Sequence, residues 1–502
     1  MNNLVEYIKS KCENLDDMFF RKMDIKNNEV WVIFNDALVD SSLASNFVIR
    51  SIVEVLNNTD NKEERENNSL KEKIEEKLNI NQAKVHLENG IAINKVKKLD
   101  KEKDNVFKYI LSGFVVIILD NEIYVMDARA NLSRSISQPV NENSIRGAKD
   151  SFVENIMMNV GLIRNRIKTE DLVYKEKEVG TKTKTKVGIM YVSSIAKNDL
   201  VELVEEKIGK IIIDGILDVN YIQEFIEERN ESGFPVSINT ERPDIVSYYL
   251  LQGRIAVLVD NSPYALILPS FFEDYINNID DLYQRSKNIT LTKIIRYACL
   301  VLTIMVPALY LALITFDQES IPTALLISFS TQREGVPFPA FVEAALMVFA
   351  FEILRESDLR SNKMAGNTLS IVGALILGDA AVSAGIVSPI MIIVIAITMI
   401  SSLAFNDINL INGLRKWRII YMLLASLCGL IGIGIATTLF VTSLVSTNSY
   451  TKTFTYPVAP LNVTEVKRNL FSRLSISEDD KRQKILTNNL TKSRRQTWKN
   501  IF

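Results

Sequence analysis

The sequence predicts an α/β cytosolic region of two related lobes followed by an all-α, multi-pass membrane domain. Three observations carry this prediction: residues 1–296 are charge-rich, residues 297–445 hold long apolar runs, and a strand–turn–strand pattern occurs twice in the first part. The overall composition, 47% hydrophobic and 24% charged, averages over these two regions. The expected parts are a first lobe at 1–135, a polar helical connector at 136–170, a second lobe at 171–290, a transmembrane domain at 291–461 and a basic cytosolic tail at 462–502.

Composition excludes several classes of function. The net charge of -2 gives no field that would favour nucleic acid. Cys12, Cys299 and Cys428 lack metal-ligand spacing and are expected as reduced thiols. His86 is the single histidine, so histidine-based triads and multi-histidine metal sites are excluded. With no nucleophile elbow or phosphate loop either, we expect no enzyme, no metal and no cofactor.

The front half carries a repeated pattern. Residues 113–126 read GFVVIILDNEIYVM and residues 253–268 read GRIAVLVDNSPYALIL, each a glycine, an apolar strand, an Asp-Asn turn and a second strand. The repeat predicts two related α/β lobes, at about 25–130 and 170–275, although such patterns also arise independently. Residues 141–171 between them predict a polar helix. The first 20 residues lack the apolar core of a signal peptide, so we expect the lobes in the cytosol.

Four apolar stretches predict membrane spans, at 297–316, 337–354, 368–405 and 419–445. The third is long enough for two crossings, broken at Gly385 or at Ser388–Pro389, which makes five in all. Lys and Arg before residue 297 place that end in the cytosol, and the tail from Asn462 has ten Lys and Arg against four Asp and Glu. Because five spans would put the tail outside, either segment 321–331 crosses or the stretch at 456–460 returns through the bilayer.

Acidic residues inside these spans are the main chemical signal, because a buried charge is costly in a membrane without water or a partner. Glu343 lies seven residues into its span, about 9–10 Å deep, and has no cation nearby in the sequence. Asp379 is placed similarly, so both are expected to line an ion path. Glu352 completes this candidate set, but Arg355 is close enough to pair with it. Candidates for pairing with the membrane acids are the loop residues Arg333 and Glu334.

Small residues surround Asp379 at helical spacing. This stripe predicts close packing of membrane helices and consists of Ala374, Gly378, Ala381 and Gly385. Pro389, in the interruption that follows, is the expected hinge.

Several motifs resemble the A subunit of GerA-family spore germination receptors. In order, they are RGAKDSF at 146–152, NVGLIRNR at 159–166, TERPD at 240–244, REGVPFPAFVEAALM at 333–347 and SIVGALILGDAAVSAGIVSP at 370–389. Together they cover about 110–460. Departures from the family pattern include Ala148 and Ser151 in the first motif and Asp317, where a histidine is usual. The stage V sporulation paralogue of the A subunit shares this architecture, and the sequence leaves both branches open.

The resemblance implies a receptor subunit in the spore inner membrane, a multi-pass cell-membrane protein acting with germinant receptor B and C subunits. It implies that nutrient detection starts germination with release of monovalent cations, and that the nutrient pocket lies mainly in the B subunit. Membrane lipid and further copies of the A subunit, as a homo-oligomer, are the other expected partners. Residues in matched motifs that are expected to mediate subunit contact or coupling are Arg146, Gly147, Asn159, Arg164, Arg166, Glu241 and Arg242.

Three classes of function follow from these features. The leading hypothesis is that several copies assemble around a ligand-gated monovalent cation channel lined by Glu343, with Asp379 contributing. A secondary transporter is the second, since broken helices and buried acids also suit coupled transport. A non-conducting scaffold whose cytosolic lobes dock other subunits is the third.

Overall fold

The structure is a computed structural model, and it describes residues 2–25, 28–45, 96–99, 103–119, 122–130, 142, 147–227, 233–283, 286–360, 378–470, 482–483 and 485–487. Arg146 and Ala374 lie outside these residues, as does His86. The chain divides into two compact units. The first, called the α/β unit, comprises residues 1–227, 237–269 and 480–502, and the second, called the helical unit, comprises residues 228–236 and 270–479.

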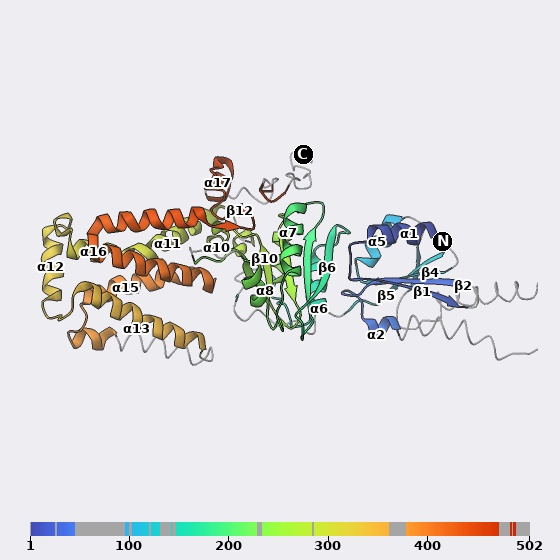
Figure 1. Ribbon diagram of the computed structural model, residues 1–502, viewed down its shortest axis with the longest axis horizontal. Helices are drawn as coiled ribbons and strands as arrows, with labels where there is room; N and C mark the ends of the chain where they lie inside the picture. The colour runs from blue at the N-terminus through green and yellow to red at the C-terminus, as the bar shows by residue number, and fades with distance from the viewer. Residues whose placement is uncertain are drawn as a thin grey trace, which may run out of the picture. The chain divides into compact units, whose positions relative to one another are not determined.

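The first lobe of the α/β unit is built on a five-stranded antiparallel sheet in the order β1-β2-β4-β5-β3 (Figure 1). Its central strands bury Val32 and Ile117, which are register partners. Helices α1 and α5 lie along one face of this sheet. The elements are α1 (Asn2–Lys11), β1 (Met18–Ile25), β2 (Asn28–Asn35), α2 (Ser41–Leu43), β3 (Val96–Leu99), α5 (Lys103–Ile110), β4 (Phe114–Leu119) and β5 (Glu122–Asp127).

The second lobe repeats this topology. Its antiparallel sheet has the order β6-β7-β9-β10-β8, which is the same order once each lobe's strands are numbered from one. The shared order supports the internal duplication that the sequence pattern predicts. The elements are α6 (Ile156–Arg166), β6 (Leu172–Val179), β7 (Thr185–Val192), α7 (Asn198–Gly209), α8 (Val219–Ile226), β8 (Ile238–Thr240), α9 (Pro243–Leu250), β9 (Ile255–Val259) and β10 (Ala265–Leu268).

The connector between the lobes differs from the expected polar helix. Among the described residues of 141–171, only α6 is helical, and most of its side chains are buried, including Asn159 and Arg164. The carboxamide of Asn155 caps its first turn by accepting from Met157 N and Met158 N. Asn159 and Arg164 are therefore interior groups with partners inside the chain, whereas Asn165 of the same motif is exposed.

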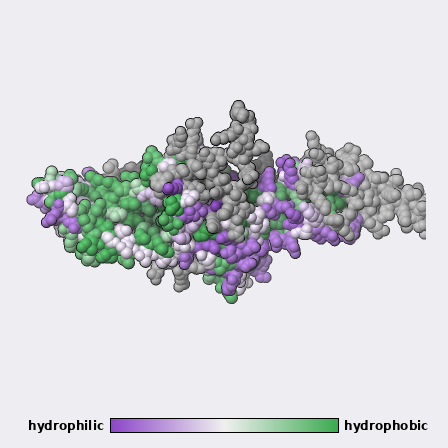
Figure 2. Space-filling view, turned by 90° about the horizontal axis from the view of Figure 1, so that it is seen from above, coloured by the Kyte–Doolittle hydropathy of each residue, from purple (hydrophilic) through white to green (hydrophobic). Residues whose placement is uncertain are grey.

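The helical unit is a bundle in which α11, α13, α15 and α16 lie side by side, and α12 lies across one end (Figure 1). Its surface is largely hydrophobic, whereas that of the α/β unit is largely hydrophilic (Figure 2). Two of its helices, at 289–315 and 408–446, are long and apolar enough to cross a membrane. The elements are α10 (Phe272–Ile276), η3 (Ile279–Tyr283), α11 (Ser286–Thr315), η4 (Gln318–Ser320), α12 (Thr323–Arg333), α13 (Ala340–Arg360), α15 (Pro389–Ser402), α16 (Ile408–Ser446) and α17 (Val463–Leu470).

Helix α16 is a hairpin of two arms, which corrects the expectation of a single span over 419–445. Gly429 has φ 60° and ψ -140°, values that interrupt the helix. The arms run back along each other, because Trp417 and Tyr421 of the first arm contact Phe440 and Thr437 of the second. Hydropathy cannot reveal this reversal, since both arms are apolar.

The segment at 447–462 also differs from expectation. It forms the short ladder of β11 (Asn448–Ser449) with β12 (Lys452–Thr453), followed by turns, so it adds strand to a domain expected to be all-α. Its residues contact others of the helical unit: Phe454 O accepts from Phe272 N, and the ring of Tyr456 lies 5.8 Å from that of Phe271. The structure thus has turns, and no helix, at 456–460, where the sequence leaves open a return through the bilayer. At the third span, the helix ends at Ser383 and a new one begins at Pro389, so the chain breaks where the sequence predicts.

Candidate functional site

Glu343 lies in the first turn of α13, and its side chain is fully buried. Its carboxylate meets the N-terminus of α15, where Ser388 is the N-cap residue. The Ser388 backbone N–H donates to Glu343 Oε1 over 2.7 Å, and the Ser388 hydroxyl donates to the same oxygen. Because a helix N-terminus carries partial positive charge, this position suits an ionised carboxylate. The N-terminus of α15, 45 residues further along the chain, thus holds the carboxylate of Glu343.

Arg333, the last residue of α12, provides the opposing charge. Its Nε lies 3.7 Å from Glu343 Oε2, and its side chain is 22% exposed. The structure therefore brings together Arg333 and Glu343, whereas Glu334 is exposed and makes no ion pair among the described residues. None of the eleven residues of α12, all of which the structure describes, is buried. Arg333 is therefore presented by a helix with little packing of its own.

A tyrosine completes this group, which we call the Glu343 cluster: Tyr310, Arg333, Glu343 and Ser388. Tyr310 comes from α11 and interacts electrostatically with the other three. Arg333 Nε and Glu343 Oε2 are buried and have no hydrogen-bond partner among the described residues. Buried polar atoms normally have a partner in protein, water or an ion. The cluster therefore has the capacity to hold one more polar species.

Glu352 is compensated by charges on another helix. Arg418 donates to its Oε1 over 2.6 Å, and Arg415 lies 2.8 Å from its Oε2, both from the first arm of α16. The local pair with Arg355 that the sequence suggests is replaced by these two contacts among the described residues. Two arginines neutralise this carboxylate, so it acts as a link between α13 and α16.

Asp379 is exposed on a helix of which the structure describes residues 378–383, and it forms no ion pair among the described residues. The structure does not bring it to Glu343. Within the small-residue stripe, Gly378 is buried, whereas Ala381 and Gly385 are half-buried. Gly385 has φ 65° and ends this helix, a conformation that favours glycine. An acid exposed on an apolar bundle needs water or a polar partner within a membrane.

Sequence reasoning missed Ser388 and Tyr310. Ser388 had a local signal, because a serine directly before a proline is the usual start of a helix, with its hydroxyl and backbone N–H directed to a partner. Pro389, expected as a hinge, is the first residue of α15. Tyr310 had no such signal, since a tyrosine in an apolar run is ordinary.

A second buried ion pair lies in the α/β unit. Arg164 of α6 donates through Nη2 to Asp17 Oδ1 over 2.6 Å and through Nε to Oδ2, with side chains 1% and 0% exposed. Asn35 donates to the same Asp17 Oδ2 over 2.8 Å. Asp17 directly precedes β1 of the first lobe, so this pair joins the two lobes.

Close by, burial raises the pKa of the Cys12 thiol to about 12.

The other motif residues also have partners within the chain. The carboxamide of Asn159 accepts from Val153 N and donates to Val153 O. Arg242 donates through Nε and Nη2 to the two carboxylate oxygens of Asp244, over 3.1 and 2.8 Å. Glu241 Oε1 accepts from Glu142 N over 2.8 Å, and Arg166 pairs with Asp150 at 2.6 Å. Gly147 is exposed with φ 137°. Burial of Asn159, Arg164, Glu241 and Arg242 favours coupling within the chain over direct contact with another subunit.

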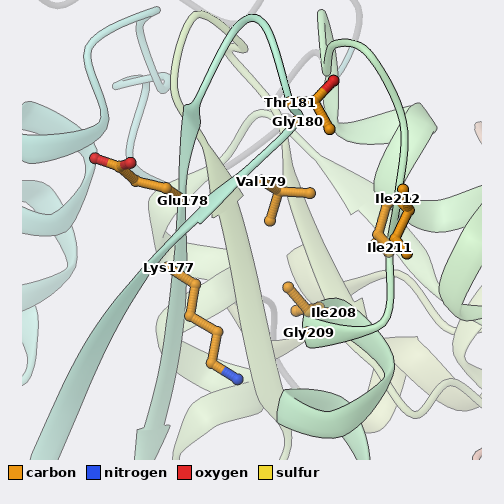
Figure 3. A pocket seen from close by; sticks show the side chains of 9 residues that line it. All are labelled: Lys177, Glu178, Val179, Gly180, Thr181, Ile208, Gly209, Ile211 and Ile212. Atoms are coloured by element: carbon orange, nitrogen blue, oxygen red, sulfur yellow. The ribbon is translucent and has the colours of Figure 1, made fainter.

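A cavity of about 210 Å³ lies in the second lobe, beside the turn that joins β6 to β7 (Figure 3). Val179 and Ile208 contribute to its wall, whereas the carboxylate of Glu178 points away. Small-molecule sites usually measure about 300–1,000 Å³ and combine apolar walls with convergent polar groups. This cavity is smaller and has no such groups. Among the described residues, no cluster of His, Cys, Asp and Glu could hold a metal.

The architecture defines a class of protein in which two α/β lobes of equal topology precede an apolar helical bundle. The family model "Bacillus/Clostridium GerA spore germination protein" matches residues 6–485. The chain belongs to this family, which confirms the prediction made from the motifs.

Similar proteins include "Spore germination protein KA" of Bacillus subtilis (strain 168), 37% identical over 77% of this chain and 71% of that protein. "Uncharacterized membrane protein YfkQ" of the same organism is 34% identical over 92% of this chain and 87% of that protein. A solved structure, that of the N-terminal domain of the A subunit of the Bacillus megaterium spore germinant receptor GerK3, is 27% identical. It covers 53% of this chain and 94% of that domain, with a TM-score of 0.37.

Proposed function

We propose that this chain is the A subunit of a nutrient germinant receptor in the spore inner membrane and transduces germinant binding by gating a monovalent cation path. Family membership supports the receptor role and, with it, B and C subunits as partners. The observation that carries the gating role is the Glu343–Arg333 contact. A buried acid is neutralised by a cation on a helix with no buried residue, so a small displacement of α12 would free the acid for a permeating ion.

Two structural facts support a multi-pass arrangement with a cytosolic tail. Residues 482–483 and 485–487 belong to the same compact unit as the described residues of 1–227, which supports the proposal that both ends of the chain lie on one side of the membrane. The α16 hairpin changes the five expected spans to six, an even number. The basic residues beside 297 and in the tail then face the cytosol together, as the positive-inside rule requires.

A homo-oligomer is part of the proposal because Asp379 is exposed on an apolar surface. In a ring of identical subunits, this acid and the half-buried Ala381 and Gly385 would face a neighbouring copy or a shared water path. Asp379 would thereby contribute to the same cation path from a position that does not contact Glu343.

The test is potassium release from spores carrying single substitutions, with protein levels verified by immunoblot. Glu343→Gln and Asp379→Asn are expected to slow germinant-triggered release about tenfold or more. Arg333→Gln is expected to raise release in the absence of germinant, because it removes the cation that holds the acid. Glu334→Gln, an exposed acid one residue further on, is the matched control and should behave as wild type.

Normal release at normal protein level in both acid variants would refute the cation path. Saturable solute uptake by reconstituted protein would favour the transporter instead. Loss of B- and C-subunit co-purification on deletion of the α/β lobes, together with wild-type release in the acid variants, would favour the scaffold.

A further inference from the structure

The C-terminal residues 482–483 and 485–487 pack within the α/β unit, although residues 270–479 of the helical unit separate them from β10 in the sequence. Arg482 Nε donates to the carbonyl oxygen of Leu251 over 2.8 Å. Leu486 and Thr487 are each only 1% exposed. Side chains of a leucine and a threonine that are buried to this extent show that these tail residues pack against the rest of the α/β unit.

The seat is the turn between α9 and β9. Leu251 is the C-cap residue of α9, where unpaired carbonyl groups and the helix dipole favour a cation, and Arg482 supplies one. Gly253 has φ 96°, and a Cβ at this position would lie 3.2 Å from Leu486 O and 3.4 Å from Ile195 Cγ2. Glycine thus gives the turn its conformation and leaves room for the tail backbone.

We propose that this turn of the second lobe, residues 251–254, is a docking site for the chain's own C-terminal segment. The occupant is identified by its position in the structure and by the complementarity of Arg482 with a helix C-terminus. The site would hold the end of the chain, which leaves the helical unit after residue 479, against the second lobe.

The test is hydrogen exchange by mass spectrometry on the full chain in detergent, comparing three variants with wild type. Leu486→Ala and a chain ending at Asp480 are expected to accelerate exchange in peptides spanning residues 250–256 about tenfold or more, because each removes the buried leucine. Ile485→Ala is the matched control, since Ile485 is only half-buried, and should stay within about twofold of wild type. Exchange in β4 and β5 reports that the first lobe remains folded.

A synthetic peptide of residues 480–490, added to the shortened chain, should restore slow exchange at 250–256. The same peptide with Leu486→Ala should require at least about tenfold more to do so. Unchanged exchange at 250–256 in both Leu486→Ala and the shortened chain would overturn the docking site. Equal acceleration by Ile485→Ala would also overturn it, since the seat would then not depend on Leu486. If Leu486→Ala does not accumulate, the shortened chain and the peptide decide the question.

Discussion

The guanidinium of Arg333 lies 3.7 Å from the buried carboxylate of Glu343. The helix that carries Glu343 has buried residues, whereas the helix that carries Arg333 has none. Glu343 sits in α13 against the N-cap of α15, whereas Arg333 ends a helix with no buried side chain. The firmly held partner is the acid, and the movable one is the cation. The proposed gating depends on this asymmetry, because only the cation would have to move.

Breaking this pair from one side should destabilise the helical unit more than removing both charges. Arg333→Met leaves an uncompensated buried acid and is expected to cost about 3–5 kcal/mol. The double variant Arg333→Met with Glu343→Gln should recover most of that loss. Thermal unfolding in detergent measures all four members of the cycle. Additive effects would show that the two side chains do not interact.

The ion pair between the lobes, Asp17–Arg164, should contribute far more to the stability of the α/β unit than an exposed pair with a similar N–O distance. Asp17→Asn is expected to destabilise the α/β unit by about 3–5 kcal/mol, because it leaves Arg164 buried without its counter-charge. Lys11–Glu170, at 2.7 Å with side chains 43% and 34% exposed, provides the control, and Lys11→Ala should have a much smaller effect because solvent screens this pair. Protease susceptibility in increasing urea measures both. Equal losses would contradict the assignment of Arg164 as the interlobe link.

The turn of the α16 hairpin should not tolerate a side chain. At Gly429 a Cβ would lie 2.6 Å from Asp317 Oδ2 and 2.8 Å from Phe316 Cβ, in a backbone conformation that L-residues rarely adopt. Asp317 also accepts from Leu430 N over 2.9 Å, at the start of the second arm. Gly429→Val is therefore expected to abolish accumulation of folded protein, whereas Gly434→Val, with open space around it, should accumulate normally. Fluorescence-detected size exclusion distinguishes the two.

The proposed even number of crossings requires the turn of this hairpin to face the side of the membrane opposite the tail. Cys428 is exposed beside this turn, so a membrane-impermeant maleimide added to intact cells should label it in a Cys299→Ala chain. Cys12 should remain unlabelled, because it is buried and its pKa is raised to about 12. A cysteine placed at Ser493 should react only after permeabilisation. Labelling of Ser493→Cys from outside would refute the even number of crossings.

The contact of Glu142 with Thr240 and Glu241 should weaken as pH rises. Burial, more than the neighbouring Glu241, raises the pKa of Glu142 from 4.5 to about 7, and Thr240 donates to its carboxylate over 2.6 Å. The folded state therefore holds a proton that the unfolded state loses between about pH 4.5 and 7, so stability falls across this window and is level above it. Glu142→Gln should remove this slope in thermal unfolding, whereas the exposed Glu154→Gln should retain it. An unchanged slope in Glu142→Gln would contradict the assignment.

Much of the α/β unit follows from local sequence. The apolar runs at 114–119 and 255–259 predict strands because they are short, β-branched and bounded by turn residues, and both are strands. The repeated Gly–strand–turn–strand order predicts two lobes of like topology, as the shared strand order supports. The break at Gly385 to Pro389 is equally local, since glycine ends one helix and Ser-Pro begins another.

The sequence by itself determined which residues of this chain are chemically unusual, namely acids and arginines in apolar or buried surroundings. Only the tertiary structure decided what each of them meets. Glu343 finds Ser388 across 45 positions, and Arg164 finds Asp17 across 147. Hydropathy and periodicity report how a residue relates to its neighbours along the chain. The partner of a buried charge is set by which helix ends and lobes pack together. The reversal at Gly429 likewise depends on packing, because a continuous apolar run does not show where the chain turns back.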